Sequence, residues 1–162
     1  MGFLAGEEVT AEDIRSVAYP PFCRLSASAG IALAHGSIVT ASWDTLETDT
    51  AGMYSAGAPT RISITEAGLY VSGVSFLLSS RADYSRIYAV IRYNGTELSR
   101  MDWRWAAINS PGTTLVAQPI PCVVGDYFEV QALQTNAGSA AASWQAVALG
   151  PAFFAYKVGG LL

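Results

Sequence analysis

The dipeptide Asn94-Gly95 lies between two runs of β-branched and aromatic residues, and this arrangement constrains the fold more than any other feature of the chain. Ile87–Tyr93 precede the dipeptide and Thr96–Trp103 follow it. Asn-Gly readily adopts the positive φ angles that a two-residue hairpin turn needs. The sequence therefore predicts an antiparallel hairpin at this point, within a fold rich in antiparallel strands.

Period-two alternation recurs along most of the chain. Apolar and polar residues alternate in Arg61–Thr65, and Val74, Phe76 and Leu78 alternate with small residues. Such alternation indicates half-buried strands. Gly, Pro, Asn and Asp separate the further strands that we expect at Phe22–Ala29, Ser37–Trp43, Thr113–Val123, Tyr127–Leu133, Ser143–Leu149 and Ala152–Val158. About eight to ten short strands with regular turn signals predict an all-β sandwich or jelly roll.

Residues 1–21 carry a different pattern. Thr10 suits a helix cap, and Ile14, Val17 and Ala18 fall on one face at helical spacing. Pro20-Pro21 ends the pattern because proline cannot continue a helix. A helix this short is not stable alone, so we expect it to dock on another surface. The chain therefore divides into an N-terminal arm with a short helix, residues 1–21, and a β domain, residues 22–162.

The chain is short of charge for its size. Charged residues make up 14% and hydrophobic residues 51% of its 162 residues, whereas a typical soluble domain carries about 25% charged residues. A single domain of this length cannot bury so many apolar side chains within itself. We therefore expect part of its apolar surface to be buried between copies in an oligomer.

The same composition argues against two classes of partner. The long uncharged stretches 105–125 and 130–156 contain prolines, glycines and side-chain amides. Neither stretch resembles a membrane-spanning helix of about 20 apolar residues. The net charge is −4, so we expect no binding to nucleic acid. The most acidic part is the arm, where Glu7, Glu8, Glu12 and Asp13 stand against Arg15.

No residue pattern indicates catalysis. His35 is the only histidine, and a Ser/His/Asp or Cys/His site would have to use it. It lies in a turn-like segment, and the chain contains no recognised nucleophile motif. Cys23 and Cys122 fit no metal-binding spacing. They can form one disulfide, but two buried free thiols are expected because no secretion signal is visible. We therefore expect no enzyme activity and no cofactor.

Two groups of residues raise the question of ligand binding. Trp103 and Trp105 are two residues apart, so in a strand they share one face and are candidate glycan contacts. Packing in the core or at an interface explains them as well. Asp44, Glu47 and Asp49 offer the oxygen ligands that calcium takes, but turns rich in Thr and Asp are common without metal. We keep the two tryptophans as candidate glycan contacts and assign no metal ligand.

Four short motifs follow one another in a recognisable order. Gly68-Leu69-Tyr70 opens a long strand, and Asn94-Gly95 forms a turn. Gly125-Asp126-Tyr127 then begins another strand, and Phe153–Tyr156 forms an aromatic last strand. This order resembles the C1q/TNF-like superfamily. The resemblance implies a jelly-roll sandwich of about ten strands that forms a compact homotrimer. We place Tyr70, Tyr127, Phe154 and Tyr156 at the expected trimer interface.

The arm carries a second resemblance. Its sequence Phe3-Leu4-Ala5-Gly6-Glu7-Glu8-Val9-Thr10-Ala11 is similar to the leaders of many tailed-bacteriophage virion proteins. This likeness implies a structural subunit whose arm contacts the major capsid or tail proteins. We expect the apolar side chains of Phe3, Val9 and Ile14 to make this attachment.

Together the two resemblances imply a bacteriophage virion protein, made in the host cytoplasm and located on the virion surface. Its trimeric knob would serve as a capsid decoration or cementing protein, or as a minor tail protein. The alternative is the receptor- or glycan-binding head of a phage tail fibre. The two roles differ in a visible way, because the second needs aromatic side chains such as Trp103 and Trp105 to be exposed.

Overall fold

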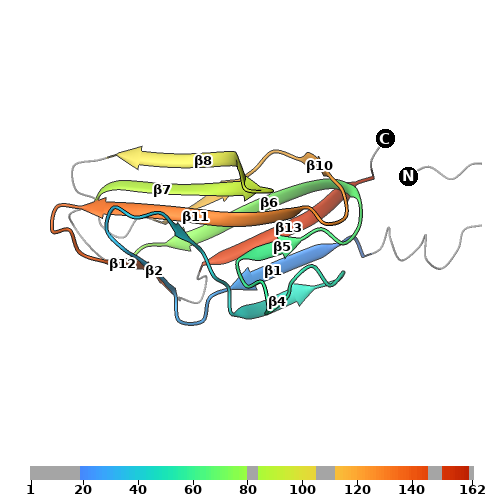
Figure 1. The fold of residues 1–162 in the computed structure, drawn as a ribbon, viewed down its shortest axis with the longest axis horizontal. Helices are drawn as coiled ribbons and strands as arrows, with labels where there is room; N and C mark the ends of the chain where they lie inside the picture. Colours follow the sequence, from blue (N-terminus) through green and yellow to red (C-terminus); the bar gives the residue numbers. More distant parts are fainter. Residues whose placement is uncertain (1–18, 80–83, 105–111, 146–150, 161–162) are drawn as a thin grey trace, which may run out of the picture.

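The protein is an all-β sandwich in which two antiparallel sheets pack face to face (Figure 1). The computed structural model describes residues 19–79, 84–104, 112–145 and 151–160. These residues form 13 strands. The expected arm helix, its attachment residues Phe3, Val9 and Ile14, and Trp105 lie outside the described residues. The expectation of an all-β fold is confirmed for the described part of the chain.

The first sheet holds the first and last strands of the fold side by side. Its strand order is β10-β6-β13-β1-β4, and β9 also pairs with β6. The register places Phe22 opposite Tyr156 and Arg24 opposite Phe154. The strands of this sheet are β1 (Phe22–Ser26), β4 (Thr45–Asp49), β6 (Gly68–Leu77), β9 (Gly112–Val116), β10 (Ile120–Cys122) and β13 (Ala152–Gly159).

The second sheet is built around the predicted hairpin. Its strand order is β3-β11-β7-β8, and β5 also pairs with β11. Asn94 and Gly95 join β7 to β8 with φ angles of 48° and 75°, so the hairpin prediction is confirmed. The strands are β3 (Val39–Thr40), β5 (Arg61–Ser63), β7 (Tyr84–Tyr93), β8 (Thr96–Arg104) and β11 (Tyr127–Asn136). A small sheet pairs β2 (Ile31–Leu33) with β12 (Ala142–Trp144).

Alternate residues of both sheets point inward and form one core. The largest fully buried side chains include Trp43, Trp144, Phe128 and Phe153. Trp43 stacks on Phe153 with ring centroids 5.4 Å apart, and Phe76 stacks on Trp144 at 4.7 Å. Aromatic packing at these distances adds to the burial of apolar area. The core leaves the other face of each sheet pointing away from the sandwich.

The described chain enters and leaves at the same end of the sandwich, toward the right of Figure 1. The carbonyl oxygen of Pro21 accepts a hydrogen bond of 2.9 Å from the backbone N–H of Lys157, near the end of β13. The Asn94-Gly95 turn and the turn between β10 and β11 lie toward this end as well. We call it the arm end, because residues 1–18 precede it in the chain.

Several expected strands are shorter than the sequence suggested. The strand expected at Thr113–Val123 is two strands, β9 and β10, with a break at 117–119. Pro119 has no backbone N–H to donate to a neighbouring strand, which favours the break. Of the expected strand Ser37–Trp43, only Val39–Thr40 pairs, and β2 and β4 were not expected. These short pieces explain why the count exceeds the expected ten.

Candidate functional site

The outer face of the first sheet is apolar along β6 and β13, whereas β1 and β4 carry the paired charges of Arg24 and Glu47. The outward positions of β6 and β13 alternate with core residues and carry no charged side chain: Leu69, Val71, Gly73, Ser75, Leu77, Ala152, Phe154 and Tyr156. Val116 of β9 lies opposite Gly73 in the register and is 51% exposed. We call the surface formed by Leu69, Val71, Leu77, Val116, Phe154 and Tyr156 the apolar face. Val116 and Tyr156 are its exposed members, Leu69, Leu77 and Phe154 are half-buried, and Val71 is buried.

Phe154 organises the apolar face. Its ring lies against Gly73, where an added Cβ atom would come within 2.3 Å of the ring atom Cζ. Only glycine leaves room for this contact. The ring of Tyr156 follows, with its centroid 6.1 Å from that of Phe154. Tyr156 is still 37% exposed. The face therefore presents ordered aromatic and aliphatic side chains that the single chain covers only in part.

The structure separates the four residues that we expected at a trimer interface. Phe154 and Tyr156 lie together on the apolar face. Tyr70 is fully buried in the subunit core, and its hydroxyl donates a hydrogen bond of 2.9 Å to the carbonyl oxygen of Glu66. Burial raises the pKa of this hydroxyl. A side chain without exposed area offers no surface to a second copy, so we remove Tyr70 from the interface.

Tyr127 lies on the other sheet. The guanidinium of Arg61 stands 3.9 Å from the centre of its ring, a cation–π geometry. It is therefore not grouped with Phe154 and Tyr156, although all three are partly exposed aromatic side chains. The structure brings together two of the four expected residues.

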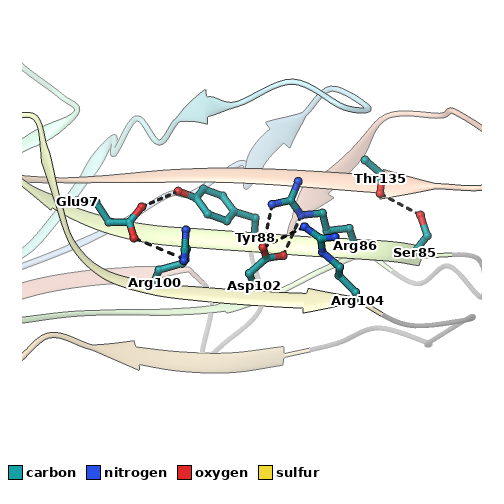
Figure 2. Close-up of polar contacts among 8 residues, drawn as sticks. All are labelled: Ser85, Arg86, Tyr88, Glu97, Arg100, Asp102, Arg104 and Thr135. Atoms are coloured by element: carbon teal, nitrogen blue, oxygen red, sulfur yellow. Dashed lines mark hydrogen bonds and ion pairs between the residues drawn. The ribbon is translucent and has the colours of Figure 1, made fainter.

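The outer face of the second sheet is charged. Five arginines and three carboxylates occupy β5, β7, β8 and β11, so this face has an excess of two positive charges. The eight residues are Arg61, Arg86, Arg92, Arg100, Arg104, Glu97, Asp102 and Glu129. We call this surface the arginine face, and Figure 2 shows its β7–β8 part.

Asp102 is the centre of the strongest pairing on the arginine face (Figure 2). Arg86 donates to it through two parallel hydrogen bonds, Nε to Oδ1 at 2.8 Å and Nη2 to Oδ2 at 2.9 Å. Nη2 of Arg104 lies 3.7 Å from Oδ2. The hydrogen bonds from Arg86 hold the pKa of Asp102 below its usual range and raise the pKa of Arg86. Such two-point pairing fixes the guanidinium plane of Arg86.

Further contacts extend this ladder along the strands. The hydroxyl of Tyr88 donates to Glu97 at 3.3 Å, and Arg100 lies 3.6 Å from the same carboxylate. Nearer the arm end, Glu129 stands between Arg61 at 3.9 Å and Arg92 at 3.8 Å. The outermost guanidiniums remain accessible, because the side chains of Arg100 and Arg104 are 54% and 72% exposed.

Trp103 does not lie with the outward residues of β8. It packs against the hydrophobic core and is only partly exposed. The outward positions of this strand are taken by Arg100, Asp102 and Arg104. Of the two candidate glycan contacts, Trp103 therefore packs inward, and Trp105 lies outside the described residues.

The remaining candidate chemical groups have local structural partners. The Nδ1 atom of His35 accepts a hydrogen bond of 3.3 Å from the backbone N–H of Asn136. Asp44 accepts hydrogen bonds from the backbone and hydroxyl of Ser28 at 2.8 and 2.7 Å. Asp49 accepts from three backbone N–H groups of residues 51, 53 and 54, and Glu47 pairs with Arg24. These contacts fix turns and strand edges.

Cys23 and Cys122 are both buried free thiols, as expected. Burial, with a smaller effect from Asp49, raises the pKa of Cys23 to about 12. Burial and the charge of Asp126 raise the pKa of Cys122 to about 11. Thiols with raised pKa values react slowly, because the thiolate is the nucleophile. Among the described residues, no three His, Cys, Asp or Glu side chains are grouped to hold a metal ion.

Comparisons with known proteins give no family for the chain. No protein-family model matches the sequence, and a search of curated proteins finds no match. In the part of the chain that the structure describes, no helix has the length and hydropathy needed to cross a membrane.

Proposed function

We propose that the chain is a structural protein of a tailed-bacteriophage virion rather than an enzyme. In this proposal three copies form a knob, and the N-terminal arms attach the knob to the major capsid or tail proteins. The knob serves as a capsid decoration or cementing protein, or as a minor tail protein. The apolar face is the observation that carries the proposal.

The proposal includes a jelly roll of the C1q/TNF-like type. Two features of the connectivity support it. The first and last strands, β1 and β13, pair inside one sheet. Between β3 and β11 the chain crosses from one sheet to the other after β3, β4, β5, β6, β8 and β10, and only β7–β8 and β9–β10 stay within one sheet. Repeated crossing of this kind is how a jelly roll winds.

The apolar face is well suited to contact a second and third copy. Burying apolar surface contributes about 25 cal/mol per Å², and stable oligomer interfaces are more apolar than the remaining surface. Phe154 is held in place by Gly73, so its ring loses little freedom on association. Because the outward residues of β6 and β13 are uncharged, burying them between copies involves no free-energy cost of dehydrating charged groups. Closed symmetry allows one such face to be used by every copy.

The arm end supports attachment to a larger particle. The described chain starts there, and Val123, Val124 and Val158 near this end are exposed. The turn that carries Val123 and Val124 is held by Asp126, which accepts hydrogen bonds from the N–H of Val123 at 2.7 Å and from Asn94 at 2.8 Å. Three arms on one rigid body bind together far more tightly than one arm alone.

The alternative role, a receptor- or glycan-binding head of a tail fibre, has less support. It needs aromatic side chains presented to solvent at the outer end of the knob. Trp103 packs against the core instead. We therefore favour attachment through the arm over recognition through the tryptophans.

The test combines solution mass with binding to particles that lack this protein. A trimer has a mass of about 51 kDa, three times 17.1 kDa. We expect this mass for the full chain by light scattering, and saturable binding to the stripped particles. The variant Phe3→Ser/Val9→Ser/Ile14→Ser should keep the trimer mass and lose the binding.

Two results would overturn the proposal. A full chain that is monomeric at micromolar concentration would remove the role of the apolar face. Undiminished particle binding by the arm variant would remove the role of the arm and would favour the tail-fibre alternative. The variant Thr10→Ser, which keeps a capping hydroxyl, serves as the control for changes in the arm.

A further inference from the structure

We propose that the acidic segment of the arm, residues 7–13, docks on the arginine face of its own subunit. This inference goes beyond attachment to a particle, and it does not depend on the trimer. It concerns two parts of one chain whose charges are both known from the sequence and the structure.

The charges of the two parts are complementary. Five of the chain's nine Lys and Arg residues lie on the arginine face, against three carboxylates. The arm carries Glu7, Glu8, Glu12 and Asp13 against Arg15, a balance of −3, in a chain whose net charge is −4. An arm of this charge is attracted to a face that carries an excess of positive charge among the described residues.

The arm is long enough to reach this face. Tyr19 is the first described residue and lies at the arm end, two residues before Pro21, which accepts the hydrogen bond from Lys157 of β13. Arg61 stands over the ring of Tyr127, the first residue of β11. Asp13 lies six positions before Tyr19 in the chain, and Glu7 lies twelve positions before it. With residues 10–18 helical at about 1.5 Å per residue and residues 7–9 extended at about 3.3 Å, Glu7 reaches about 23 Å from Tyr19, and a fully extended arm carries it to about 40 Å. Two packed sheets lie about 10 Å apart, and the arm must span this distance to pass from the first sheet to the second. A ten-residue strand such as β7 is about 33 Å long, which is the length of the arginine face along the strands.

The outer guanidiniums are free to receive carboxylates. Asp102 holds Arg86 at two points, whereas Arg100 and Arg104 touch their acidic partners only at 3.6 and 3.7 Å and are more than half exposed. Guanidinium groups pair with carboxylates through two parallel hydrogen bonds. Arg100 and Arg104 can therefore turn toward the arm while Arg86 keeps the carboxylate of Asp102 in place.

The tether makes this weak contact effective. A single exposed ion pair contributes little, but a segment joined to its site by a short linker acts at a local concentration in the millimolar range. The contact should be sensitive to salt, because ions screen exposed charges. Docking holds the acidic segment on the subunit and would compete with attachment to a particle.

The apolar face offers the arm's carboxylates no such partner. Its outward residues on β6 and β13 are uncharged. The nearest arginine on that sheet, Arg24 of β1, already pairs with Glu47 at 2.6 Å. The arm's acidic segment is therefore expected on one side of the sandwich only.

The test places a spin label in the arm of the full chain. Ala11→Cys lies between Glu8 and Glu12, and the buried native thiols should react slowly with the label. At low salt we expect the backbone amide signals of Tyr88 and Arg100 to lose more than half their intensity. Those of Ser75 and Ala152, outward positions of the first sheet at the end away from the arm, should lose much less. The loss should disappear in about 1 M salt.

Charge reversal provides the decisive comparison. Arg100→Glu/Arg104→Glu should abolish the broadening, and adding Glu7→Arg/Glu8→Arg should restore it. The control Arg24→Glu, an exposed arginine on the opposite sheet, should leave it unchanged. Three results would each overturn the proposal: no broadening at low salt, broadening that persists in Arg100→Glu/Arg104→Glu, or broadening that appears only between different chains in a mixture of labelled and isotopically enriched protein. The salt dependence is measured on the labelled Ala11→Cys protein, in which both faces keep their native residues. It therefore tests the proposal even if a charge variant fails to fold.

Discussion

The two outer faces of this sandwich share one backbone geometry and differ in chemistry. On β6 and β13 the outward side chains are aromatic and aliphatic, and the ring of Phe154 packs on Gly73. On β7 and β8 the outward side chains are mainly arginines, a tyrosine and carboxylates that pair with one another (Figure 2), with Val90 buried among them. The difference shows that the arginine face can remain in water, whereas burial of the apolar face against another surface lowers the free energy.

The physical reason is the different cost of leaving each face exposed. Paired charges at a surface remain hydrated, and each exposed pair contributes little to stability. Apolar surface in water is unfavourable in proportion to its area. A contiguous apolar surface on a single chain is therefore the usual mark of an interface. The following changes test this contrast, from the largest expected effect to the smallest.

Charge placed on the apolar face should dissociate the oligomer. The variant Val116→Arg/Tyr156→Arg alters two exposed side chains, so the fold should tolerate it, but burying unpaired guanidiniums between copies is costly. We expect the mass measured by light scattering to fall from about 51 kDa to 17.1 kDa. The change Arg104→Glu on the opposite face is the control and should leave the mass unaltered. An unchanged mass in the first variant would show that another surface joins the copies.

Filling the space under Phe154 should destabilise the subunit. In Gly73→Ala the new methyl group would occupy the position of the ring, so the ring must move away from the strand. We expect a loss of about 1 kcal/mol in the free energy of unfolding, measured with urea. Gly57→Ala is the matched control, because its Cβ makes only an ordinary contact of 3.6 Å with Ser55. Equal stabilities of the two variants would contradict the role assigned to Gly73.

Removing the central carboxylate of the arginine face should have a smaller effect that depends on salt. Asp102→Asn leaves the guanidiniums of Arg86 and Arg104 without their shared anion. We expect a decrease of about 1–2 °C in the melting temperature at low salt. The difference should shrink in about 1 M salt, because screening weakens the pairs in the unaltered protein. A salt-independent loss would mean that packing, rather than charge, sets the contribution of Asp102.

The smallest effect should appear on acidification. Arg86 lowers the pKa of Asp102 in the folded chain, so ionised Asp102 stabilises the fold above its unfolded pKa of about 3.9. This stabilisation should be lost as the pH falls below about 4 and through the lowered pKa. Urea unfolding of the unaltered protein and of Asp102→Asn between pH 2 and 6 measures it. The two curves should converge at the acid end, and parallel curves would contradict the assignment.

Local sequence signals predicted the parts of the fold that depend on neighbours in the chain. Asn94-Gly95 predicted the hairpin because its residues accept positive φ angles, and both adopt them. Period-two alternation is likewise a pattern of neighbouring residues, and it indicated the strands β5, β6 and β11. The three-residue strands β2 and β12 pair with each other across 109 residues, from Leu33 to Ala142, and no local signal marks such a partner.

Alternation alone could not assign Tyr70 and Phe154 to their faces. Both are aromatic residues in long strands, and a shift of one residue in register exchanges the two faces of a strand. The structure turns Tyr70 into the core and Phe154 outward onto Gly73. The sequence likewise contained the five arginines, but only the register of β11, β7 and β8 gathers them on one surface.

The sequence by itself determined an all-β domain after the arm, its central hairpin, two buried thiols and a surplus of apolar residues. These properties follow from backbone preferences and composition, which act locally or as totals. Tertiary structure decided which apolar residues form the core and which lie on the apolar face. It also decided that the five arginines of the arginine face point away from Phe154 and Tyr156. Strand pairing makes these choices, because it joins residues that are far apart in the chain and fixes the side of the sheet to which each one points.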